Sequence, residues 1–288
     1  MRVKLLKFII TILCILLASV VVTILYCIIN TSHKVTVISY NIDTDLENSM
    51  RIVQLTDLHE EEFGENNEKL IKTVKEQNPD IIVMTGDMQN KTDEDTSIVC
   101  DLVEKLSAVA DVYYSYGNHE KEWERNFNRS FADLVSESGA IVVDNEYVDV
   151  EINDNSLRIA GYMGCYSAIH MTASTEEQQE REKEFEKNFE DTDRYKILLN
   201  HIPTSWVDWG YLDDYSVDLV FSGHYHGGQI VLPVLGPLYA PYIGFFPKNV
   251  KGVYQGTQTT CILSTGLGTE YFIPRVNNPP EIIVADLH

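Results

Sequence analysis

Short apolar runs alternate with amphipathic segments along most of the chain. Buried strands are predicted at 52–56, 80–84, 112–115, 197–199, 219–221 and 261–264, and further strands at 35–40, 140–143, 147–152 and 157–160. Helical spacing of apolar residues covers 66–77, 95–108 and 123–138. Strands alternating with helices predict sheets that are covered by helices. Because no Pro/Gly/Ser-rich linker divides residues 31–288, we expect one domain there.

The N-terminal segment has a different pattern. Residues 8–29 carry no charge, and as a helix these 22 residues would be ~33 Å long, enough to cross a bilayer core. A cleavable signal peptide is the alternative, but its apolar region is usually about 7–15 residues and ends at small residues. Here the run ends at Tyr26-Cys27-Ile28-Ile29-Asn30. We therefore expect residues 1–30 to form a cytoplasmic tip and one N-terminal transmembrane helix.

The charges that flank this segment predict its orientation. Three basic residues precede it, Arg2, Lys4 and Lys7, whereas Lys34 is the only Lys or Arg in the first 20 residues after it. The positive-inside rule then places the N-terminus in the cytoplasm. The sequence thus predicts a single-pass protein of the cell membrane whose domain at 31–288 is extracytoplasmic.

Composition restricts the function of that domain. The chain has 44 acidic and 22 basic residues, and without Arg2, Lys4 and Lys7 the remaining 19 basic residues give residues 31–288 a net charge of −25. No nucleic-acid partner is expected, since such proteins use Lys and Arg to displace phosphate counterions. An apolar content of 44% supports a folded core rather than disorder.

Two segments have conspicuous composition. The charge run at 176–193 is interpreted as a solvated helix. Residues 232–248 contain four prolines and four aromatic residues. They are interpreted first as an irregular loop packed on the core, with a wall of the substrate site or a membrane-dipping surface as the alternatives.

Residues able to bind metals follow five of the predicted strands. They are Asp57 and His59 after 52–56, Asp87 after 80–84, Asn118 and His119 after 112–115, His201 after 197–199, and His224 and His226 after 219–221. Five of the eight histidines lie in these loops. Open α/β sheets bind ligands at the carboxyl ends of their strands, so the five loops are expected to converge on one site.

The types of side chain predict which metals bind. Imidazoles and carboxylates without thiolates suit Mn, Fe or Zn. The seven candidate ligands Asp57, His59, Asp87, Asn118, His201, His224 and His226 exceed the four of a tetrahedral zinc site. They suffice for two ions that share a carboxylate, an arrangement that activates water for attack on phosphorus.

This series of motifs resembles the calcineurin-like metallophosphoesterase superfamily. The motifs Asp57-x-His59, Gly86-Asp87, Gly117-Asn118-His119-Glu120, His201 and Gly223-His224-x-His226 occur in the family's order. The Gly227-Gly228-Gln229 extension and the segment from Gly266 to Ile282 are similar to a membrane-anchored bacterial subgroup. That subgroup includes enzymes acting on lipid-linked pyrophosphates such as UDP-diacylglucosamine.

The resemblance implies a role for each of these residues. Asp57, His59 and His226 would hold one divalent ion, Asn118, His201 and His224 a second, and Asp87 would bridge both, with Mn favoured and Fe or Zn as alternatives. His119 would stabilise or protonate the leaving oxygen. The implied fold is α/β, a four-layer α/β/β/α sandwich with two mixed sheets. Tyr225 stands where the family often has threonine.

Three functions remain open at this point. The first is a metal-dependent hydrolase of phosphoester or pyrophosphate bonds that acts on a lipid-linked substrate at the membrane. The second keeps the chemistry but acts on soluble nucleotides or phosphoproteins. The third is a non-catalytic scaffold with the same fold, which the complete set of predicted ligands disfavours.

Overall fold

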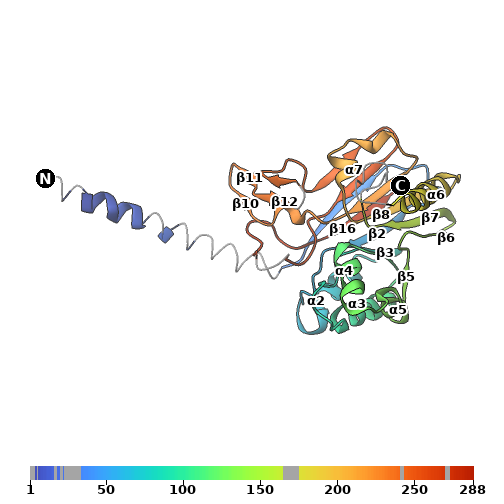
Figure 1. Cartoon of the computed structure of the whole chain (residues 1–288), viewed down its shortest axis with the longest axis horizontal. Coiled ribbons are helices and arrows are strands. Elements are labelled where there is room, and N and C mark those ends of the chain that lie inside the picture. Colours follow the sequence, from blue (N-terminus) through green and yellow to red (C-terminus); the bar gives the residue numbers. More distant parts are fainter. Residues whose placement is uncertain are drawn as a thin grey trace.

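The computed structural model describes residues 34–164, 175–240, 243–269 and 273–288, and parts of 4–22 (Figure 1). Two six-stranded sheets form the centre of the molecule. The first has the order β1-β16-β2-β3-β4-β5, and all its neighbours are parallel except β16 and β2. Its strands are β1 Thr36–Ile42, β16 Glu281–Leu287, β2 Met50–Leu55, β3 Ile81–Thr85, β4 Asp111–Ser115 and β5 Ala140–Val142.

The second sheet has the order β14-β15-β9-β8-β7-β6. Its inner strands β15, β9, β8 and β7 are parallel, and the two edge strands are antiparallel to their neighbours. The strands are β14 Gly252–Gln255, β15 Thr260–Leu263, β9 Leu219–Ser222, β8 Tyr195–Asn200, β7 Asn155–Tyr162 and β6 Tyr147–Ile152.

The two sheets pack face to face, with helices on their outer faces. Side chains such as Ile52 and Val83 of the first sheet share one buried cluster with Leu199 and Phe221 of the second. Alternate residues of the first sheet bury against η1 Glu65–Asn67, α2 Glu68–Glu76, α3 Ser97–Ser107, α4 Asn118–Phe127 and α5 Phe131–Glu137. The outer face of the second sheet packs on α6 Glu176–Glu190, α7 Thr204–Val207 and η3 Tyr211–Asp213. The expected fold of two mixed sheets between helices is confirmed.

One expected helix differs from the structure, and two strands of the large sheets were not expected. The helix predicted at 123–138 is two helices, because Asn128 has a left-handed backbone (φ 51°) and Ser130 starts a new helix by accepting a hydrogen bond from the Asp133 amide. The strands β14 and β16 were not predicted, although β16 lies between β1 and β2 in the first sheet and β14 forms an edge of the second.

The charge run at 176–193 is helical as predicted, but it is not solvated on all sides. Phe185 stacks on Tyr162 with ring centroids 5.8 Å apart, and Phe189 is fully buried. The hydrophobic period of this helix is hidden by the ten charged residues among its fifteen.

Within 232–248, the described residues 232–240 and 243–248 are more regular than the irregular loop that was expected. They form most of two small hairpins, β10 Val231–Leu232 with β11 Gly236–Pro237 and β12 Tyr239–Ala240 with β13 Gly244–Phe245. Figure 1 shows β10, β11 and β12 together at one end of the domain, with α6 and β6 at the other.

The expected transmembrane segment at 8–29 lies in large part outside the described residues. Residues 6–15 are helical. Within the described part of the chain, no helix is both long and apolar enough to cross a membrane.

Candidate metal centre

All eight predicted site residues lie just beyond the carboxyl ends of strands. Asp57 and His59 follow β2, Asp87 follows β3, Asn118 and His119 follow β4, His201 follows β8, and His224 and His226 follow β9. These five strands belong to two sheets that face each other, and their carboxyl ends meet at one edge of the sandwich. The structure therefore brings the predicted residues together.

The side chains form two buried groups. In the first, the Nε2 atom of His226 lies 3.3 Å from Nε2 of His59 and 3.4 Å from Oδ1 of Asp57. In the second, Nε2 of His201 lies 3.2 Å from Nδ1 of His224 and 3.1 Å from Oδ2 of Asp87. The donor atoms within each group all lie within 4.8 Å of one another.

These separations fit metal coordination. With metal–ligand bonds of about 2.1 Å, neighbouring ligand atoms in octahedral or tetrahedral geometry are about 3.0–3.4 Å apart. The separations of 3.1–3.4 Å within the two groups fall in or near that range. The buried Oδ1 of Asn118 has no hydrogen-bond partner among the described residues, as a metal ligand would require.

Asp87 lies between the two groups. Its Oδ2 atom is 3.1 Å from Nε2 of His201 and 4.0 Å from Nε2 of His59, while its Oδ1 accepts a hydrogen bond from the His119 amide at 2.8 Å. One carboxylate thus reaches donors of both groups, which is the geometry that a bridging ligand needs.

Neighbouring groups orient two of the histidines. Nδ1 of His59 is 3.0 Å from the side-chain oxygen of Asn90, and Nδ1 of His201 is 2.8 Å from the Thr85 carbonyl. Because both partners are acceptors, Nδ1 carries the proton in the neutral form of each ring, and the Nε2 lone pair of that form points into the site. Asn90 was not singled out from the sequence, since its distance of 31 positions from His59 hides the contact.

Burial sets the protonation of the site. It lowers the pKa of His59 to about 4 and, with the neighbouring His201, that of His224 to about 3, so both are neutral near pH 7. Burial also opposes charge on His201, but the Asp87 carboxylate outweighs it and raises the His201 pKa to about 10. Neutral imidazoles and a carboxylate are the forms that bind a cation, and a bound ion would displace the proton of His201.

The backbone at the site is strained. Left-handed φ angles between 47° and 72° occur at Asp57, His59, Asp87, His224 and His226. Such conformations cost about 1–3 kcal/mol each for residues other than glycine and persist where the surroundings impose them. The fold thus holds five of the candidate ligands in conformations that isolated peptides avoid.

Two glycines allow the loops to approach the carboxylates. A Cβ atom at Gly117 would lie 2.2 Å from Oδ1 of Asp87, and one at Gly223 would lie 2.2 Å from Oδ2 of Asp57. Any side chain at either position would displace a candidate metal ligand.

Glu120 joins two of the site loops. Its carboxylate is fully buried and accepts hydrogen bonds from the amides of Asp87, Gly117, Met88 and Gln89 at 2.8–3.1 Å, and from the Tyr114 hydroxyl at 2.9 Å. All five groups donate hydrogen bonds to Glu120. A protonated carboxyl would find no acceptor for its own hydrogen among them, so these contacts fit the ionised form of Glu120. This residue appears in the sequence motif, but its contacts could not be derived from spacing.

His119 faces the site from the start of α4. Its ring packs edge-on against His59 with centroids 4.6 Å apart, and its Nδ1 accepts from the Lys91 amide at 3.4 Å. This contact leaves Nε2 to carry the proton in the neutral ring. His119 is thus beside the donors but is not part of either group.

Arg275 supports the site from the C-terminal segment. The side chain is 1% exposed and donates to the carbonyls of Gly268 and Thr265 at 2.7 Å. The loop that it holds also contacts Asp57, since the Gly268 amide donates to the Asp57 carbonyl at 2.6 Å. Its role required the structure, because 218 residues separate Arg275 from Asp57.

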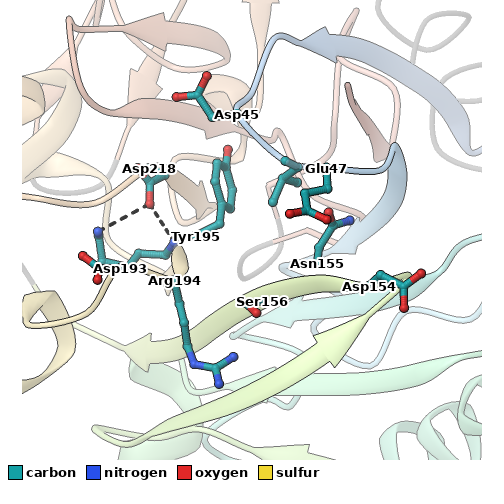
Figure 2. A pocket seen from close by; sticks show the side chains of 11 residues that line it. Asp45, Glu47, Asp154, Asn155, Ser156, Asp193, Arg194, Tyr195 and Asp218 are labelled. Atoms are coloured by element: carbon teal, nitrogen blue, oxygen red, sulfur yellow. Dashed lines mark hydrogen bonds and ion pairs between the residues drawn. The ribbon is translucent and has the colours of Figure 1, made fainter.

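A separate pocket of about 360 Å³ lies at the opposite strand ends of the second sheet (Figure 2). It is lined by Tyr195 at the start of β8 and by Asp218 just before β9, whereas the metal groups follow the other ends of these strands. Asp218 accepts from the Lys196 amide at 2.7 Å and lies 3.7 Å from its ammonium group. This pocket is therefore not part of the metal centre.

Similar proteins of known family are phosphoesterases, which agrees with a metal centre of this kind. A family model described as calcineurin-like phosphoesterase matches residues 50–228. The uncharacterized metallophosphoesterase YkuE of Bacillus subtilis is 30% identical over 254 residues, covering 82% of this chain and 78% of that protein. The phosphodiesterase YaeI of Escherichia coli is 23% identical over 213 residues, covering 74% and 72% of the two chains.

Among solved structures, TT1561 of Thermus thermophilus is similar with a TM-score of 0.48 and 14% identity, covering 76% of this chain and 91% of that one. The family model covers more than half of the chain and includes all eight site residues. The chain belongs to the calcineurin-like phosphoesterase family and is a metal-dependent phosphoesterase.

Proposed function

We propose that the chain hydrolyses phosphoester or pyrophosphate bonds with two divalent ions, preferentially Mn²⁺, on a lipid-linked substrate at the membrane surface. The observation that carries the dinuclear part is the pair of buried donor groups on either side of Asp87. When bound, two such ions activate a water molecule and neutralise charge on the phosphoryl oxygens.

The protein's own residues hold and orient this chemistry. Asp57, His59 and His226 would hold one ion, and His201, His224 and Asn118 the other. Asn90 and the Thr85 carbonyl keep His59 and His201 in the required tautomer. His119, with its proton on Nε2, would donate a hydrogen bond to the leaving oxygen.

Exchange of Asp87 for asparagine tests the dinuclear assignment. The full chain in detergent is stripped with a chelator, supplied with Mn²⁺ and assayed on a chromogenic phosphodiester and a monoester. The wild-type protein should bind two ions and hydrolyse these substrates. Asp87→Asn should lose turnover and bind both ions more weakly, because the bridge loses its charge. Normal turnover with two ions bound in the variant contradicts the bridging role.

The predicted N-terminal membrane segment is the basis for the lipid-linked substrate. Residues 8–29 carry no charge, and the described side chains Phe8, Leu13 and Ile15 are 63%, 59% and 62% exposed, so they are not packed on the domain. The 26 residues between Asn30 and Asp57 include β1 and β2, so the metal centre would stay close to the bilayer. We infer a cytoplasmic N-terminus and an extracytoplasmic domain from the flanking charges.

Comparing two substrates in one preparation distinguishes a lipid-linked substrate from a soluble one. A lipid-linked pyrophosphate in vesicles should be hydrolysed with a higher kcat/KM than a soluble nucleotide pyrophosphate. The reverse order would favour the soluble-nucleotide function. Protease protection of the domain in sealed cells tests the orientation, and cleavage from the cytoplasmic side only would contradict it.

A further inference from the structure

The two hairpins formed by β10 to β13, here called the hairpin pair, present large apolar side chains to solvent. Val234 is fully exposed, and Leu235, Phe245 and Phe246 are 66%, 73% and 52% exposed. Tyr239 and Ile243 are also exposed. No comparable group of neighbouring exposed apolar residues occurs elsewhere in the described part of the domain from residue 34 onward. Such a cluster marks an interaction surface.

The local backbone makes this cluster unusual. Val234 and Phe246 have left-handed φ angles of 70° and 54°. Glycine or asparagine adopts this backbone conformation more readily than valine or phenylalanine. Either residue would also expose less apolar surface to solvent. A β-branched residue in this conformation is strained, so the turn gains neither stability nor solubility from valine. An apolar contact outside the chain would account for it.

The surrounding sequence has a separate charge pattern. Residues 219–269 contain no Asp or Glu, so all 44 acidic residues lie in the other 237 positions (288 − 51). The same stretch carries Lys248 and Lys251 just after the hairpin pair. The hairpin pair and the residues that follow it are therefore apolar and basic in sequence, on a chain that is otherwise strongly acidic. This pattern complements an anionic lipid surface.

The hairpin pair lies near the start of the domain. The Val231 amide donates to the Val276 carbonyl at 2.9 Å, and four residues later the Pro280 carbonyl accepts from the Thr36 amide at 2.8 Å. Thr36 begins β1, and only residues 30–35 separate it from the apolar segment. Six residues span at most about 20 Å. A membrane-inserted segment would hold this face close to the bilayer.

The hairpin pair also adjoins the metal centre. A Cβ atom at Gly228, two residues after His226, would lie 2.5 Å from Cβ of Pro237. The base of the hairpins thus packs directly on the turn that carries a candidate ligand.

We propose that the hairpin pair lies in the headgroup region of an anionic bilayer, with Val234, Leu235, Phe245 and Phe246 in contact with the acyl chains. This contact turns the metal centre toward phosphoesters at the membrane surface. The proposal rests on the membrane attachment inferred above, but it does not require turnover.

Tryptophan fluorescence tests the contact. Phe245→Trp and, as a matched control, Tyr147→Trp are made in the full chain and reconstituted into phosphatidylglycerol-containing vesicles with brominated acyl chains. Tyr147 is 37% exposed on β6, at the far end of the domain. Relative to wild type, Phe245→Trp should gain emission that is shifted to shorter wavelength and quenched by the bromines, and Tyr147→Trp should gain unquenched emission.

Each other outcome overturns the proposal. Absence of bromine quenching at Phe245→Trp means that the hairpin pair is not in the bilayer, and equal quenching of both added tryptophans means that the lipid contact is not specific to the hairpin pair. Absence of bromine quenching together with a shift that depends on protein concentration means that a second copy covers the face. The same measurement in an Asp87→Asn background should be unchanged, so failure of catalysis and failure of membrane contact are distinguishable.

A kinetic comparison adds a functional readout. Val234→Asp should lower kcat/KM for a phosphoester embedded in vesicles by roughly tenfold, since burying one large apolar side chain is worth about that factor. Turnover of a soluble chromogenic phosphodiester should not change. Val253→Asp, at another exposed valine on β14, serves as the control. Equal losses on both substrates would contradict the proposal.

Discussion

Replacing Glu120 by glutamine should destabilise the metal centre far more than its nearly isosteric size suggests. The two carboxylate oxygens divide five donors between them. Oε2 accepts from the amides of Asp87 and Gly117, and Oε1 from those of Met88 and Gln89 and from the Tyr114 hydroxyl. Glutamine offers one oxygen and one NH₂ group, so in either orientation two backbone amides face a donor.

The cost follows from the number of unsatisfied groups. Each buried donor without an acceptor costs about 1–3 kcal/mol, so Glu120→Gln should lower the free energy of unfolding by roughly 2–6 kcal/mol. A domain is stabilised by only about 5–15 kcal/mol in total. The loops that carry Asp87 and Asn118 should separate first, because this carboxylate joins them. We therefore expect loss of turnover and of metal affinity together.

Glu124→Gln is a matched control on the same helix. Oε1 of Glu124 accepts from both the Tyr116 hydroxyl and the Phe131 amide at 2.9 Å, and these bonds survive with glutamine because one oxygen makes both. Unfolding by urea in detergent, with and without Mn²⁺, measures both variants. A loss for Glu120→Gln no larger than for Glu124→Gln would show that the five hydrogen bonds do not hold the loops.

Three further predictions concern the metal centre. His119→Ala should keep normal metal content but lose about 10²–10⁴-fold in rate, most for poor leaving groups; a parallel loss of metal would make His119 a ligand. Gly223→Ala should weaken metal binding and cost about 1–3 kcal/mol, because its Cβ would overlap Asp57; Gly164→Ala, whose Cβ would be 3.8 Å from its nearest neighbour, is the control. Removing metal held at about 100 times its dissociation constant should lower stability by about 2.7 kcal/mol, measured as a fall in unfolding temperature, and Asp87→Asn should abolish this difference.

Local patterns predicted most strands of the two sheets. Apolar runs such as 80–84 and 219–221 bury on both faces, so their composition alone identifies them. The helix at 123–138 was predicted as one piece, because the break depends on the backbone of a single residue, Asn128. In α6, Phe185 and Phe189 were overlooked among charged neighbours, since two aromatic residues four positions apart give a weak periodic signal.

The candidate ligands were identifiable because chemistry restricts them to a few residue types at strand ends. Histidines and carboxylates in five successive loops form a pattern that single residues do not. The groups that orient these ligands are common residue types. Asn90 lies outside every motif, and Arg275 lies in a segment whose resemblance to other proteins did not indicate its role. Only their contacts with His59 and with the loop beside Asp57 distinguish them.

The sequence by itself thus predicted the type of chemistry and the candidate ligands, and it determined the acidic, N-terminally apolar character of the chain. It did so because residue type and strand periodicity are local properties. The tertiary structure showed which donors lie together, that Asp87 lies between both groups, and that an apolar hairpin pair adjoins the centre. These features depend on contacts between segments far apart in the chain, such as the hydrogen bond between His224 and Asp57, which are 167 positions apart. They follow from how the two sheets pack, which local pattern does not encode.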